Sequence, residues 1–130
     1  MGTIKFHGRV LNPGSGEGPA VVEEALSFYG EVDPKTGTTV SGKTIHDRVL
    51  VIGRPRGSTV GSYTLYGLKY YSRKPLAIIV ESEADPILVV GAILADIPLF
   101  DKVKGIMERV SDGIIITFKD TGEITISSDG

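Results

Sequence analysis

The chain of 130 residues contains no cysteine and no tryptophan. Without cysteine it can form no disulfide and cannot hold an iron–sulfur cluster through thiolates of its own. The sequence also lacks an apolar run long enough to span a bilayer, and Met1 to Phe6 show no basic segment leading into an apolar core. We therefore expect a cytoplasmic protein without disulfides and without a membrane span.

Neither sign of charge is in large excess, because 14 basic and 16 acidic residues leave a net charge of -2. Such a balance provides no general attraction to nucleic acid or to an anionic membrane, so neither is an expected partner. The composition, 41% hydrophobic and 23% charged, is typical of a globular protein. A chain of this length buries one core, and we expect a single domain over residues 1–130 whose binding depends on a local site.

Alternating apolar and polar residues predict strands near both ends of the chain. One half-buried strand is expected at 3–11, and a closing hairpin is expected at 114–118 and 123–127. Between them, the segment 12–19 (NPGSGEGP) is rich in glycine and proline, so we expect no regular element there. Residues 20–32 give mixed signals for helix and strand.

The centre of the chain alternates between apolar strands and helices. Apolar runs at 48–53 and 75–80 are typical of strands that are buried on both faces, and helices are predicted at 63–73 and 86–95. Asp85-Pro86 suits the start of the second helix, with aspartate as N-cap and proline in the first turn. The order strand, helix, strand, helix between extended segments predicts an α/β domain with a small parallel core joined by antiparallel strands.

Both predicted helices carry apolar side chains that we assign to the core. Tyr63, Tyr66 and Tyr70 recur at three- and four-residue spacing, which favours core packing, with hydroxyls reaching water, over contact with a ligand. The segment 86–95 (PILVVGAILA) is almost wholly apolar, and we expect this helix to be buried.

Scattered ionisable residues offer weaker candidates for chemistry. Glu81, Glu83 and Asp85 could form a metal or general-acid cluster, but their alternation favours a solvated strand end followed by an N-cap. The two histidines, His7 and His46, lack the spacing of metal ligands. No metal ligand is therefore assigned in this chain. A Ser-His-Asp set would need long-range folding to form and is also disfavoured.

The most informative segment is the glycine-rich loop from Gly53 to Ser62 (GRPRGSTVGS), which leaves a buried strand and enters a helix. Free backbone N–H groups at the positive end of that helix suit a carboxylate or phosphate. Hydroxyl donors and fixed positive charges of the loop are supplied by Ser58, Thr59, Ser62, Arg54 and Arg56. Walker A spacing is absent, so nucleotide hydrolysis is discounted. A serine-capped turn without a ligand is the competing interpretation.

This loop, with the preceding RVLVI and the following helix, resembles the serine loop of the aconitase swivel domain in its small-subunit form. Three further segments resemble the aconitase X small subunit: ALSFYGEVDPKTG at 25–37, PLAIIV at 75–80 and ADIP at 95–98. The resemblance covers nearly the whole chain. It implies a swivelling β/β/α domain that binds a large subunit as a heterodimer, with a [4Fe–4S] cluster on the large subunit and no cofactor bound by this chain.

The resemblance also implies a hydro-lyase, a carbon–oxygen lyase that is active only with its large subunit. The implied reaction removes water from (R)-5-phosphomevalonate, a phosphorylated hydroxy acid, to give trans-anhydromevalonate 5-phosphate in the archaeal mevalonate pathway of isoprenoid biosynthesis. The alternatives are another aconitase-like hydro-lyase, of the isopropylmalate or hydroxyproline type, and a non-catalytic scaffold domain that binds an anion.

The family's proton-abstracting serine corresponds to Ser62 in this sequence. Ser58 is the competing match, because both serines directly follow a glycine. We expect substrate binding, through the loop N–H groups and a guanidinium, at Arg56, Gly57, Ser58 and Thr59.

Overall fold

The computed structural model describes residues 2–55 and 61–127. Its strands in chain order are β1 (Thr3–His7), β2 (Arg9–Asn12), β3 (Gly16–Leu26), β4 (Val32–Asp33), β5 (Thr38–Thr39), β6 (Val49–Pro55), β7 (Ala77–Val80), β8 (Leu99–Asp101), β9 (Ile115–Phe118) and β10 (Glu123–Ser127). Its helices are α1 (Phe28–Glu31), α2 (Gly61–Tyr70), α3 (Pro86–Ala95) and the 3₁₀ turn η1 (Ile106–Glu108). None of the helices in these two ranges is long and apolar enough to cross a bilayer.

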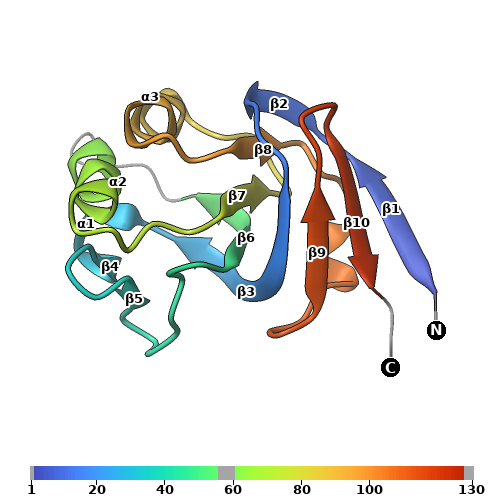
Figure 1. Cartoon of the computed structure of the whole chain (residues 1–130), viewed down its shortest axis with the longest axis horizontal. Helices are drawn as coiled ribbons and strands as arrows, with labels where there is room; N and C mark the ends of the chain where they lie inside the picture. The colour runs from blue at the N-terminus through green and yellow to red at the C-terminus, as the bar shows by residue number, and fades with distance from the viewer. Residues whose placement is uncertain (1, 56–60, 128–130) are drawn as a thin grey trace.

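Eight strands form one mixed sheet in the order β1-β10-β9-β3-β6-β7-β8-β2, while β4 and β5 pair separately (Figure 1). The strands β3, β6, β7 and β8 run parallel to one another, and the other pairs in the sheet are antiparallel. The long strand β3 links the two parts, because its residues 16–19 pair with β9 and its residues 20–26 pair with β6. The predicted parallel core joined by antiparallel strands is confirmed.

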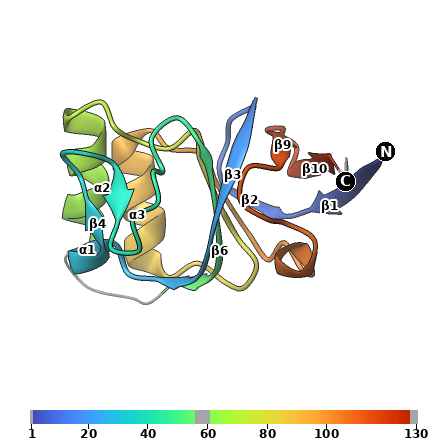
Figure 2. The same cartoon turned by 90° about the horizontal axis from the view of Figure 1, so that it is seen from below.

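Two apolar cores lie on opposite faces of the parallel strands. Successive side chains of a strand point to opposite faces, so Leu50 and Ile52 of β6 join the cluster under α2 and α3. Val49 and Val51 join the cluster formed with β9, β10 and η1. Figure 2 shows the resulting layers, with the helices on one side of the parallel strands and the antiparallel strands on the other. The layers confirm the β/β/α architecture.

The glycine-rich segment 12–19 differs from the prediction, because β3 already begins at Gly16. A Cβ atom at Gly16 would lie 2.8 Å from the Phe118 ring, so glycine serves there for close approach between strands and not for a turn. The single strand expected at 3–11 is divided at Gly8, which separates β1 from β2. The mixed segment 20–32 contains the rest of β3, the single turn α1 and the start of β4.

The tyrosines of α2 do not pack in the core, and the prediction of core packing is wrong. Tyr63, Tyr66 and Tyr70 are 76%, 52% and 73% exposed, whereas Leu65 and Leu68 are buried. The leucines occupy the opposite side of the helix and already fill the space over the sheet. The tyrosines are therefore left on the outer surface.

Helix α3 has the predicted bounds, but only one of its faces is buried. Its buried residues are Leu88, Gly91, Ala92 and Ala95. On the opposite side, three large aliphatic residues are about half exposed: Val90 (51%), Ile93 (49%) and Leu94 (55%). An outer layer of a small domain has only one neighbour to pack against, so an all-apolar sequence leaves half of this helix uncovered.

Candidate functional site

The predicted loop lies where the parallel strands β6 and β7 end, which we call the carboxyl edge of the sheet. Arg54 and Pro55 end β6, and Gly61 begins α2. The loop positions named from the sequence, Arg56, Gly57, Ser58 and Thr59, fall outside the described residues. In open α/β sheets, ligands bind beyond the carboxyl ends of the strands, so this edge is the first place to examine for a site.

Ser62 is the second residue of α2, in the first turn of a helix of ten residues. The backbone N–H groups of a first turn have no partner within the helix and carry the positive end of its dipole. Helix α3 also starts at the carboxyl edge, because Asp85 caps it directly after the loop that follows β7. Two helix N-termini therefore lie at the edge where the sequence places the candidate serine.

A cleft of about 280 Å³ opens at the carboxyl edge, lined by Glu24, Gly53, Arg54, Glu81, Ser82 and Met107. A second hollow of about 380 Å³ shares Glu81 and Ser82 with it and adds Glu83, Lys102 and Lys104. Arg54 is exposed and forms no ion pair with a described carboxylate. A fixed positive charge of the predicted loop is thus available to an anion at this edge.

Glycine is required in the floor of this cleft. A Cβ atom at Gly53 would lie 2.6 Å from the backbone oxygen of Glu24. The strands β3 and β6 approach each other so closely at this point that no side chain fits.

The wall of the cleft opposite β6 is the loop that follows β7, and backbone hydrogen bonds hold it in place. Glu81 N donates to Ile52 O at 2.9 Å, and Ser82 N donates to Gly53 O at 3.1 Å. The Glu81 carboxylate in turn accepts a hydrogen bond from Met107 N at 3.0 Å, in η1. The cleft is therefore built from strand ends and from a loop that hydrogen bonds hold in place, which gives it a defined shape.

The acidic residues Glu81, Glu83 and Asp85 show the predicted N-cap and the predicted solvated position, and one of them is held in a way that was not predicted. Asp85 is the N-cap of α3, since its Oδ1 accepts from Leu88 N at 2.8 Å, and Pro86 begins the helix. Glu83 is exposed, as expected of a solvated position. Glu81 differs, because it is half-buried and fixed by Met107. The three carboxylates do not form a metal cluster, and no group of three or more His, Cys, Asp or Glu that could hold a metal exists within the described ranges.

A buried carboxylate that the sequence analysis did not single out supports the same loop. Asp101 at the end of β8 is fully buried, and Arg9 of β2 donates to it through Nε at 2.9 Å and Nη2 at 2.8 Å. Ala84 N also donates to Asp101, at 2.8 Å. The hydrogen bond to Asp101 is the main cause that raises the pKa of Arg9. A charged residue directly after the apolar pair Leu99-Phe100 is the sequence signal that could have identified Asp101.

His46 lies away from the carboxyl edge. His46 precedes β6, at the opposite end of that strand, and His7 ends β1. A strand of seven residues is about 20 Å long, so His46 is far from the start of α2. Its Nδ1 is buried and has no hydrogen-bond partner among the described residues, while its Nε2 lies 3.2 Å from Asp47 Oδ2. His46 is therefore too far from the start of α2 to form a catalytic set with Ser62.

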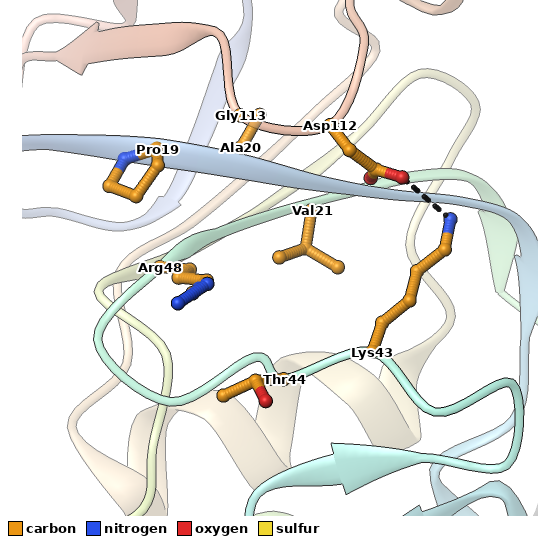
Figure 3. A pocket seen from close by; sticks show the side chains of 8 residues that line it. All are labelled: Pro19, Ala20, Val21, Lys43, Thr44, Arg48, Asp112 and Gly113. Carbon is orange, nitrogen blue, oxygen red and sulfur yellow. Dashed lines mark ion pairs between the residues drawn. The ribbon is translucent and has the colours of Figure 1, made fainter.

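Another pocket, of about 230 Å³, lies where the middle of β3 passes the start of β6 (Figure 3). One ion pair among its lining residues joins Lys43 Nζ to Asp112 Oδ2 at 3.2 Å. Both charged groups have further partners, because Lys43 donates to Val22 O at 2.6 Å and Asp112 accepts from Val22 N at 2.8 Å. The Val22 N–H, and then Lys43, lower the pKa of Asp112. Lys43 and Asp112 are therefore already paired with each other and with the backbone of β3. Arg54 at the carboxyl edge has no such partner in the part of the chain that the structure describes, so that edge remains the candidate site.

Known proteins are similar to this chain over almost its full length. The sequence model of the family described as aconitase X swivel domain matches residues 5–126. The phosphomevalonate dehydratase small subunit of Aeropyrum pernix is 46% identical, over 100% of this chain and 98% of the relative. The protein of the same name from Thermococcus kodakarensis is 40% identical, over 98% of this chain and 99% of the relative.

Solved structures show the same fold. The crystal structure of Thermococcus kodakaraensis aconitase X in its holo-form is similar with a TM-score of 0.87 and 38% identity, over 95% of this chain and 98% of that one. A UPF0107 protein solved in solution by NMR is similar with a TM-score of 0.86 and 34% identity, over 95% of this chain and 99% of that one.

Proposed function

The chain belongs to the aconitase X swivel-domain family, and we propose that it is the small subunit of a hydro-lyase that dehydrates (R)-5-phosphomevalonate to trans-anhydromevalonate 5-phosphate. The observation that carries this proposal is the similarity over the full length, 40% to 46% identical, to relatives named phosphomevalonate dehydratase small subunit. The proposed enzyme is a cytoplasmic heterodimer in the archaeal mevalonate pathway. Residues 1–130 would form its swivel domain.

We propose Ser62 as the base of this reaction. Dehydration breaks a C–H bond next to the substrate carboxylate, places its electron pair in the new double bond and expels the hydroxyl group from the neighbouring carbon. A carbon acid of this kind is weak, so a positioned base and fixed donors for the developing negative charge are both required. The first turn of α2, which contains Ser62, supplies a positive helix end that favours a serine alkoxide.

The substrate carries a carboxylate and a phosphate, so two anionic groups need partners. We propose that they bind through Arg56, Gly57, Ser58 and Thr59. Arg54 supports this placement, because it is exposed in the cleft and free of ion pairs with described carboxylates. Glu24 and Glu81 line the same cleft and would repel an anion, so we expect the anionic groups on the side nearer α2.

This chain is unsuited to hold an iron–sulfur cluster, because it contains no cysteine to supply thiolate ligands. The [4Fe–4S] cluster of the proposed enzyme would therefore lie on the large subunit. The small subunit would contribute the serine and the anion-binding loop. Neither subunit alone would have a complete active site.

Reconstitution of the chain with its cognate large subunit tests this function. The mixture should dehydrate phosphomevalonate, and this chain alone should be folded and inactive. Isopropylmalate and hydroxyproline serve as competing substrates. Activity of this chain without the large subunit, or turnover of a competing substrate in place of phosphomevalonate, would contradict the proposal.

The role of Ser62 is tested in the same mixture with Ser62→Ala. The substitution removes one oxygen and little volume, so we expect the fold to survive, turnover to fall at least roughly 100-fold and substrate binding to be largely kept. Ser58→Ala is the matched control. A severe loss at Ser58 with a mild one at Ser62 would move the base to Ser58, and mild losses at both would leave the loop as a binding element only.

A further inference from the structure

Six exposed apolar or aromatic side chains gather on the outer side of the two long helices. We call this surface the outer helix face, and its members are Tyr63, Tyr66 and Tyr70 of α2 and Val90, Ile93 and Leu94 of α3, each about half exposed or more. Among the described residues, three other large hydrophobic side chains have comparable exposure. Tyr71 packs edge-on against Tyr70, with ring centroids 5.0 Å apart, whereas Val40 and Ile115 lie outside these helices.

The two helices lie side by side on one face of the sheet (Figures 1 and 2). They run in the same direction, because both begin at the carboxyl edge and an ion pair joins their ends. Lys69 in the last turn of α2 places its Nζ 2.6 Å from Oδ2 of Asp96, the C-cap of α3. Since each helix has its buried residues toward the sheet, the outward sides of both form one surface.

Leaving this surface in water is unfavourable. Single exposed hydrophobic residues are ordinary, but a contiguous group marks an interaction site. Helix α3 has no charged or polar side chain between residues 86 and 95, and a helix that is apolar all round is normally covered on all sides. Tyrosine is also enriched at protein interfaces, where its ring is buried and its hydroxyl finds a partner.

The position of the face indicates which partner covers it. Tyr63 directly follows Ser62 in the first turn of α2, so the outer helix face starts beside the proposed base. A large subunit that completes the active site at Ser62 would already touch this end of the face. A second copy of this chain on the same face would sit beside Ser62 and compete with the large subunit.

We propose that the outer helix face is the surface on which the large subunit binds. This inference rests on the proposed function, since it takes the large subunit as the partner. The association would bury the exposed side of α3 and the tyrosine rings of α2, and it would thereby position the first turn of α2 in the shared active site.

The test introduces a charge at one position on each helix and at one position elsewhere. Ile93→Lys and Tyr66→Lys alter α3 and α2 independently, at side chains that are 49% and 52% exposed. Ile115→Lys is the matched control, because Ile115 is 40% exposed on β9, in the antiparallel part of the sheet. All three replacements are at exposed positions, so we expect the variants to fold, as monitored by thermal melts.

Binding is measured by titrating the cognate large subunit into each labelled chain. We expect the Kd to rise at least roughly tenfold for Ile93→Lys and Tyr66→Lys, as for central interface residues, and to change less than about twofold for Ile115→Lys. The concentration of large subunit that gives half-maximal dehydratase activity should shift by the same factor. Turnover at saturating large subunit should equal that of the wild type, because Ile93 and Tyr66 have no proposed role in the chemistry.

Other outcomes separate this inference from the proposed function. If both variants of the outer helix face bind like the wild type while the wild-type complex is active, the large subunit binds elsewhere. The proposed function is then kept and the inference about the face is overturned. If the wild-type chain is a dimer in sedimentation and Ile93→Lys makes it monomeric with unchanged affinity for the large subunit, a second copy covers the face and the inference is overturned. A wild-type chain that neither binds the large subunit nor supports dehydration would overturn both.

Discussion

Replacing Asp101 should destabilise the protein and loosen the loop that forms one wall of the candidate site. The carboxylate is fully buried and accepts three hydrogen bonds, two from Arg9 and one from Ala84 N. In Asp101→Asn the amide oxygen can keep the Oδ2 position, which serves Arg9 Nη2 and Ala84 N. The amide nitrogen then faces Arg9 Nε, another donor, so one hydrogen bond to a charged group is lost.

The magnitude follows from these contacts. A hydrogen bond to a charged group contributes about 1.5–3 kcal/mol to the free energy of unfolding, and we expect Asp101→Asn to cost that amount. Asp101→Ala removes all three bonds and leaves the N–H of Ala84 buried without this partner. The Arg9 side chain is 45% exposed and can be hydrated. The cost for Asp101→Ala is therefore about 3 kcal/mol, at the low end for breaking a buried pair.

Urea unfolding followed by far-UV circular dichroism measures both costs. Asp120→Asn is the control, since Asp120 is an exposed turn residue for which we expect a change within about 0.5 kcal/mol. Amide hydrogen exchange at Ala84 should also accelerate in both Asp101 variants. If both Asp101 variants unfold like the wild type, the carboxylate does not hold the loop and this reasoning is refuted.

Two further predictions concern charged groups. Arg56→Ala should raise the KM for phosphomevalonate in the reconstituted enzyme roughly tenfold or more, as expected for a lost charge-assisted contact, with little change in melting temperature. An unchanged KM would remove Arg56 from the binding residues. Asp112 has a lowered pKa in the fold, so its contribution to stability is present at neutral pH and lost as the pH falls below about 3.9. The stability difference between wild type and Asp112→Asn should therefore shrink in acid, and a pH-independent difference would contradict this.

The sequence by itself determined much of the local structure. Apolar runs fixed β6 and β7 because strands that are buried on both faces admit few polar residues. Asp85-Pro86 fixed the start of α3, because an N-cap acceptor followed by proline needs only local geometry. The loop GRPRGSTVGS and its flanking segments identified the family through residue identity. These features depend on neighbours in the chain.

Only the tertiary structure decided which surfaces are covered and which distant groups meet. Spacing separated the two sides of α2, but it could not show that Leu65 and Leu68 fill the core and leave the tyrosines outside. Composition predicted that α3 is buried, whereas its position in an outer layer leaves one side open. Asp101 gains its importance from Arg9, 92 positions away in the chain. Burial and long-range pairing depend on how the layers pack, and local sequence does not contain that information.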